Sequence, residues 1–161
     1  MAMLAGCGYH TAGSATHIPA GVRTIAVPIF VNKTQAYRTE TLFTAAVIHE
    51  LNARTQYVIV NRDGADADAT LRGVIVKQTI DPLTYDTSTG QSSSYLVTVT
   101  AAVTLTARDG HVLYRNNDLV FRQQYQSTQD LGSFIQEGSP AMDRMSKGFA
   151  AAVVSDMLES F

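Results

Sequence analysis

The chain has 161 residues, enough for one domain with a single buried core. Twelve Lys and Arg against fourteen Asp and Glu give a formal charge of −2, and no run of like charges occurs. The sequence therefore lacks the basic footprint of a nucleic-acid-binding protein. Apolar residues make up 45% and charged residues 16%, but no apolar stretch reaches the ~18 residues that cross a bilayer as a helix. We expect a surface rich in Thr, Ser, Gln and Asn.

The only cysteine, Cys7, closes the sequence Leu-Ala-Gly-Cys at residues 4–7. A lone cysteine excludes an internal disulfide. The pattern is typical of bacterial lipoprotein processing, in which the cysteine becomes the acylated first residue. Residues 1–3, which precede this pattern, supply neither a charged n-region nor an apolar stretch. The alternative is a free cysteine in a disordered leader. We expect residues 1–21 to be a lipobox remnant and flexible tether, and residues 22–161 to form one domain.

Three elements are predicted in the first half of the domain. Residues 22–30 alternate as a strand, in which Pro28 indicates an edge position or a bulge. Residues 39–54 carry apolar side chains at every fourth position, which predicts an amphipathic helix. Residues 55–61 are β-branched and predict a second strand, parallel to the first because a helix connects them.

The second half predicts a long antiparallel ribbon. A third strand surrounds Gly73, which indicates a bulge or a close backbone approach. Residues 81–94 are predicted to be a loop. Residues 95–107 then alternate between an apolar face and a threonine face, the strongest periodic signal in the chain. Asp109-Gly110 predicts a tight turn, and the strand that returns after it is predicted to carry a bulge at residues 116–118.

A second helix is predicted from Ser139-Pro140 to the C-terminus, because Met142, Met145 and later apolar residues recur at helical spacing. Two helices with apolar faces and one sheet bury each other best as two layers. The expected fold is an α+β two-layer sandwich. It has a mixed, mostly antiparallel sheet of 4–5 strands with a long hairpin, and two helices on one face. The threonine-rich face is left to solvent or a partner.

No catalytic or metal-binding pattern emerges. The histidines at 10, 17, 49 and 111 share no metal-like spacing, and no Ser/His/Asp or Cys/His arrangement is present. Asp63, Asp66 and Asp68 resemble part of a calcium loop, but its terminal Glu is absent, so a solvated turn explains them better. We expect a binding or assembly role, no cofactor and no enzymatic activity.

Taken in order, these elements resemble the LptE (RlpB) family of lipopolysaccharide-assembly lipoproteins. The resemblance covers nearly all of residues 7–160. The stretches that carry it are CGYH at 7–10, TIAVPIFVNKT at 24–34, AVIHELNAR at 46–54, ADATLRGVI at 67–75 and GQSSSYLVTVTAAVTL at 90–105.

The resemblance implies a lipoprotein held by acylated Cys7 on the periplasmic face of the outer membrane. It would plug the lumen of a β-barrel partner, LptD, assist its assembly and help pass lipopolysaccharide outward. A threonine-rich sheet face suits a polar barrel interior. The segment between Lys77 and Arg108 lacks Lys and Arg, so weak or indirect lipopolysaccharide contact is expected. The candidate lipopolysaccharide or partner contacts are Arg72, Lys77, Arg115, Arg122, Thr98, Thr100 and Thr104.

Two other readings stay open. The same order of strand, helix and strand resembles periplasmic lipoproteins that regulate a cell-wall synthase or form part of an export complex. An enzyme of another class would use Asp63, Asp66 or Asp68 with a metal to hydrolyse its substrate.

Overall fold

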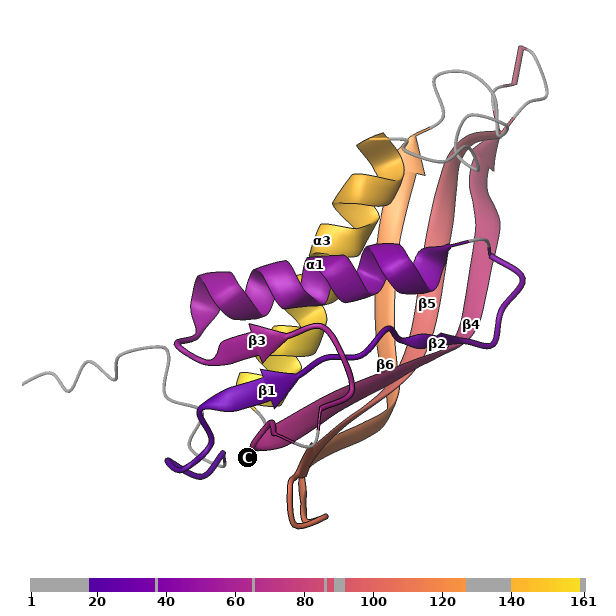
Figure 1. The fold of residues 1–161 in the computed structure, drawn as a ribbon. Helices are drawn as coiled ribbons and strands as arrows, with labels where there is room; N and C mark the ends of the chain where they lie inside the picture. Colours follow the sequence, from indigo (N-terminus) through magenta and orange to yellow (C-terminus); the bar gives the residue numbers. More distant parts are fainter. Residues whose placement is uncertain are drawn as a thin grey trace, which may run out of the picture.

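A computed structural model describes residues 18–36, 38–64, 66–85, 87–88, 92–126 and 140–159. Figure 1 shows a strongly twisted sheet with both helices on the same side of it. In chain order the elements are β1 (Thr24–Ala26), β2 (Val31–Asn32), α1 (Thr39–Arg54), β3 (Val58–Val60), β4 (Ala69–Tyr85), β5 (Ser92–Ala107), β6 (Val112–Gln126) and α3 (Pro140–Glu159).

The sheet is mixed, with the order β3-β1-β4-β5-β6 and the two-residue β2 also paired with β4. β1 runs parallel to both β3 and β4, while β4, β5 and β6 pair antiparallel. The parallel pairing of β1 with β3 confirms the connection predicted from the helix between them. The architecture confirms the expected α+β two-layer sandwich with a long hairpin.

The predicted strand 22–30 was too long, because the chain leaves the sheet between β1 and β2. Pro28 supplies no backbone donor there. The backbone N–H of Phe30 instead donates to the Thr44 Oγ1 of α1 at 2.9 Å. The Phe30 ring is buried against Gly73, at whose position an added Cβ would lie 2.4 Å from the ring. Gly73 therefore marks a close approach, one of its two predicted roles.

The predicted loop at 81–94 was wrong for most of its length. β4 continues to Tyr85 and β5 begins at Ser92, with Pro82 opposite Tyr95. Residues 81–85 carry a proline and little alternation, so only pairing with β5 makes them a strand. A proline is tolerated because β2, the last neighbour on the outer side of β4, reaches only Ile75.

The hairpin between β5 and β6 confirms the turn prediction. Gly110 has a φ of +89°, which glycine adopts without strain, and Ala107 N–H donates to His111 O at 2.8 Å. Between Leu119 and Asn116, β6 carries two residues opposite the single residue 102 of β5. That irregularity confirms the bulge predicted at residues 116–118.

The core lies between the sheet and the two helices. The rings of Phe43 on α1 and Phe149 on α3 stack with centroids 4.4 Å apart, and the Phe121 ring of β6 meets Phe149 edge-on. Met145 and Met157 are fully buried, so these methionines fill the core. Ser139, the predicted cap of α3, lies outside the described residues.

Candidate functional site

The side chains of β5 show that one face of the sheet is buried and the other is open. Val97, Val99, Ala101, Val103 and Leu105 have no accessible surface and pack under the helices. The side chains between them, Thr98, Thr100 and Thr104 among these, are partly exposed on the other side. Successive side chains of a strand point to opposite faces. We call the side that carries the threonines the open face.

The pairing register places all four predicted cations on the open face. Thr104 lies between Arg72 of β4 and Arg115 of β6. Residues directly opposite in antiparallel strands share one face. With neighbouring strands about 4.8 Å apart, the two arginine Cα atoms lie about 10 Å apart across β5.

Two further rows cross the open face. Lys77 lies opposite Thr100, and Thr98 lies opposite Arg122. The structure thus brings the seven residues that sequence reasoning selected onto one surface, although they come from three strands.

Charge on the open face is partly neutralised. Arg72 Nη2 lies 2.6 Å from Asp63 Oδ1, with both side chains about 60% exposed, so the pair adds little to stability. Among the described residues, Lys77, Arg115 and Arg122 make no ion pair. The face therefore presents three cations that are spread out among hydroxyl groups.

Sequence reasoning missed the acidic and aliphatic members of the open face. Asp81 pairs with Leu96 and so lies on this side near its far end. Val31 of β2 lies beside Val74 of β4 and is 55% exposed, and Val120 lies opposite Thr100. Only the strand register places these three residues on the open face, because their neighbours in sequence do not indicate which side of the sheet they occupy.

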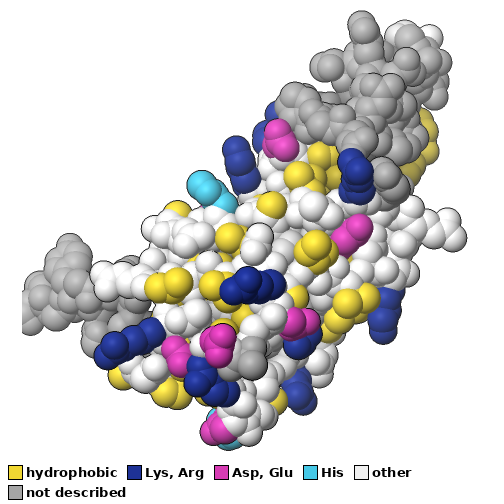
Figure 2. Space-filling view, viewed as in Figure 1, with side chains coloured by type: hydrophobic (Ala, Val, Ile, Leu, Met, Phe, Trp, Pro, Cys, Tyr) yellow, Lys and Arg dark blue, Asp and Glu magenta, His cyan; other side chains and the backbone are white. Residues whose placement is uncertain are grey.

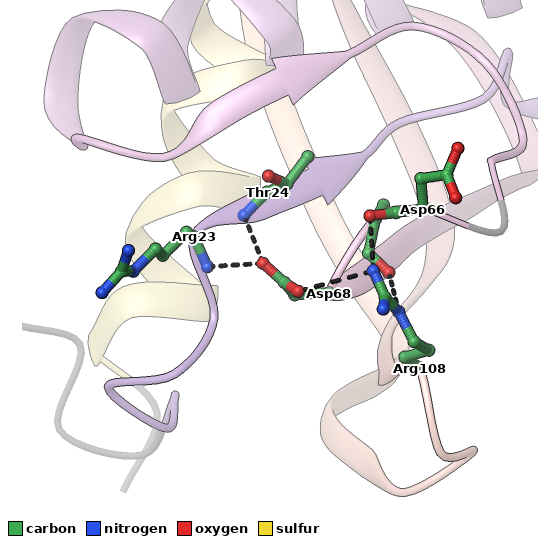
Figure 3. A network of polar contacts seen from close by, with 6 residues as sticks. Arg23, Thr24, Asp66, Asp68 and Arg108 are labelled. Atoms are coloured by element: carbon green, nitrogen blue, oxygen red, sulfur yellow. Dashed lines mark hydrogen bonds and ion pairs between the residues drawn. The ribbon is translucent and has the colours of Figure 1, made fainter.

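The three aspartates of the suspected metal loop have separate structural roles. Asp68 accepts the backbone N–H groups of Arg23 and Thr24 at 3.0 Å each. Arg108 contacts Asp68 at 3.6 Å and donates to the backbone oxygens of Asp66 and residue 67 (Figure 3). These backbone donors, aided by Arg108, lower the pKa of the Asp68 carboxyl.

The network ties the start of β1 to the start of β4 and to the turn after β5. With Asp63 paired to Arg72, the described residues contain no group of three His, Cys, Asp or Glu side chains that could hold a metal.

The buried face contains a second polar cluster. Tyr114 Oη and Asn116 Nδ2 of β6 both donate to Asp156 Oδ2 of α3. Burial raises the pKa of Tyr114, and the neighbouring carboxylate adds to the effect. Burial also raises the pKa of Tyr125 to about 12. The hydrogen bonds to Asp156 join α3 to the edge strand β6, so this cluster has a structural role.

On the face that carries the helices, the described residues form no comparable site. Figure 2 shows its acidic and basic side chains scattered singly or in small mixed groups. His49 is exposed on α1 and His111 is exposed in the turn after β5, while the histidines at 10 and 17 and Cys7 lie outside the described residues. No helix in the described part of the chain combines the length and the apolar character needed to cross a membrane.

Comparison of the fold finds several solved structures of low sequence identity. An uncharacterized lipoprotein B from Nitrosomonas europaea aligns with a TM-score of 0.56 at 12% identity, covering 96% of this chain and 94% of that one. PelC from Paraburkholderia phytofirmans, a dodecamer, aligns at 0.50 with 16% identity over 89% and 94%. A minor lipoprotein from Acinetobacter baumannii aligns at 0.50 with 13% identity over 88% and 94%. These likenesses establish the fold alone.

A comparison with curated proteins gave no significant match. The family model described as LptE, lipopolysaccharide-assembly, matches residues 22–157, which includes every strand and nearly all of α3. The LptE family is one of non-enzymatic lipoproteins. Because the match covers nearly all of the described domain, with its two-layer fold and open sheet face, the chain belongs to the LptE family of lipopolysaccharide-assembly lipoproteins.

Proposed function

We propose that this lipoprotein is a subunit of the outer-membrane lipopolysaccharide translocon and docks against the inner wall of its β-barrel partner, LptD, through the open face. In this role it plugs the barrel and assists its assembly. The observation that carries the proposal is the open face itself, which the helices leave uncovered and which is polar but weakly charged.

The chemistry of the face suits a polar wall. The hydroxyls of Thr98, Thr100 and Thr104 can donate and accept hydrogen bonds, so they match either kind of group on a partner. Burying hydroxyls that find partners costs little, whereas burying isolated charges is expensive. A threonine face with few charges can therefore be covered by a large polar surface.

The proposed lipid anchor, Cys7, precedes the first strand in the chain. An acylated Cys7 would hold the chain to the periplasmic face of the outer membrane, and residues 8–17 span at most about 35 Å when fully extended. Ile18 is buried at the edge of the core, and the backbone hydrogen bonds of Asp68 fix Arg23 and Thr24 a few residues later. The tether would thus pull on a firmly attached strand.

Direct contact with lipopolysaccharide is weak or indirect in this proposal. Lys77, Arg115 and Arg122 lie on three rows of the face rather than in one cluster, and polyanion binding needs convergent cations. Tight binding of lipopolysaccharide by the delipidated chain, lost on Lys77→Ala or Arg122→Ala, would contradict this part.

Affinity capture of the full-length lipoprotein from outer membranes tests the proposal, with mass analysis of its partners and of its first residue. We expect a large outer-membrane barrel and an acylated Cys7. Thr100→Arg adds charge and volume at the centre of the open face and should reduce barrel capture about tenfold or more. Ala45→Arg, on the exposed side of α1, is the matched control and should leave capture unchanged.

Two results would reject the proposal. Equal capture of the barrel by Thr100→Arg and the unmodified chain would show that the open face is not the docking surface. Capture of a cell-wall synthase, or of a ring of identical subunits, in place of a barrel would support the alternative reading as an export or cell-wall lipoprotein.

A further inference from the structure

The far end of β4 exposes two large apolar side chains. We call residues Asp81–Tyr85 the β4 tip. All five residues are exposed, and Leu83 and Tyr85 keep 46% and 61% of their surface accessible. Neither belongs to the hydrophobic core or packs against it. Large apolar side chains grouped in solvent mark interaction sites more often than isolated ones do.

The tip pairs irregularly with β5. The register shifts between Pro82 and Thr84 and again between Thr84 and Tyr85. Such irregularities at strand ends redirect side chains away from the regular alternation. Ser92 lies opposite Tyr85, and Ser94 Oγ lies 2.7 Å from Thr84 Oγ1. At Thr84 the neighbouring strand therefore presents a hydroxyl group, while Tyr95 lies opposite Pro82 where the tip begins.

The tip lies at the opposite end of β4 from the residues that pair with β1. Figure 1 shows β4 and β5 running past α1, away from the hairpin turn that joins β5 to β6. Ala107, which pairs with the start of β4, lies thirteen positions along β5 from Ser94, which pairs with the tip. At ~3.3 Å per residue this is about 43 Å. A chain anchored near Ile18 thus holds the tip where a partner can reach it.

The charge at the tip favours an uncharged protein surface as its partner over an anionic lipid or a second copy of this chain. Asp81 is its only charged residue, β5 has none, and the last cation on β4 is Lys77. An anionic lipid headgroup would meet a carboxylate there rather than a cation. Two tips from separate copies would bring their Asp81 carboxylates together, and like charges in contact are unfavourable.

From this we infer that the β4 tip is a second, separate contact with the barrel partner, in which Leu83 and Tyr85 enter an apolar pocket of that protein. The inference rests on the proposed function. The tip continues the same two strands that build the open face, so one partner can cover both. An aromatic ring and an aliphatic side chain in a desolvated pocket are typical anchors of a protein interface.

Site-specific photocrosslinking identifies the occupant directly. The full-length lipoprotein carries a photoreactive phenylalanine analogue in place of Tyr85, or in place of Val58 as the control. Val58 is 60% exposed and lies on β3, away from the tip. We expect a covalent adduct with the barrel from position 85 and none from position 58. An adduct with a second copy or with lipid, or no adduct in membranes where the barrel is captured, would overturn the inference.

Capture by tip variants supplies an independent readout. Leu83→Ser combined with Tyr85→Ser should weaken barrel capture about tenfold, whereas Val58→Ser should not. Since the replaced side chains lie outside the core, the variant should keep its circular dichroism spectrum. Capture that fails for the unmodified chain rejects the proposed function itself. Capture that falls with Thr100→Arg but not with the tip variant rejects the tip contact alone.

Discussion

Replacing Gly73 by alanine should destabilise the domain, although alanine normally suits a strand better than glycine. The added Cβ would lie 2.4 Å from Cδ2 and Cε2 of the Phe30 ring, whereas carbon atoms in contact prefer about 3.5–4.0 Å. Either the ring or the strand must therefore move by about 1 Å or more. Gly73 does not have a positive φ, so space is what requires glycine here and not backbone conformation.

The size of the effect follows from what Phe30 contributes. Its ring is 2% exposed, and removing a buried phenylalanine costs about 3–5 kcal/mol. Overpacking a core costs about 1–3 kcal/mol. Because the ring can give way only in part, we expect Gly73→Ala to lower the free energy of unfolding by about 2–4 kcal/mol.

A double-mutant cycle isolates the cause. In a Phe30→Ala background the obstructing ring is gone, so Gly73→Ala should become neutral or stabilising by about 0.5–1 kcal/mol. Urea unfolding of all four chains, followed by circular dichroism, measures the coupling. Gly64→Ala, whose Cβ would meet nothing within 4 Å, is the control. Equal costs of Gly73→Ala in both backgrounds would refute the close approach as the reason.

Three further predictions concern α3, the Asp68 network and the alkaline limit. Gly148→Ala should destabilise by about 1–3 kcal/mol in urea unfolding despite alanine's helix propensity, because its Cβ would lie 2.7 Å from Phe121 Cζ; a gain in stability would contradict this. The folded-state pKa of Asp68 is lowered, so the stability it contributes is present above its unfolded pKa and is lost as pH falls through the folded pKa. Unfolding curves in acid should therefore show less pH dependence for Asp68→Asn than for the unmodified chain, and equal dependence would disprove the role. The pKa of Tyr125 is raised to about 12, so stability should fall as pH rises from about 10 toward 12. Tyr125→Phe should lessen that fall in thermal melts, and an unchanged fall would assign it to another group.

The sequence by itself determined the elements whose signal is local. Residues 39–54 form α1 with the predicted bounds, since apolar side chains at every fourth position favour a helix wherever they occur. The alternation of residues 95–107 predicted both faces of β5, and Asp109-Gly110 predicted the turn after it. The four cations and three threonines were chosen from the sequence, but the pairing register is what places them on one face.

Tertiary structure decided the features that depend on distant partners. β4 extends to Tyr85 because β5 supplies its hydrogen bonds, and the strand predicted at 22–30 is interrupted where Phe30 packs onto Gly73 and its N–H finds Thr44. Asp68 acts on backbone groups more than forty residues away. A local pattern fixes which way neighbouring side chains point, but contacts across strands arise only when the chain folds, so no window of sequence could specify them.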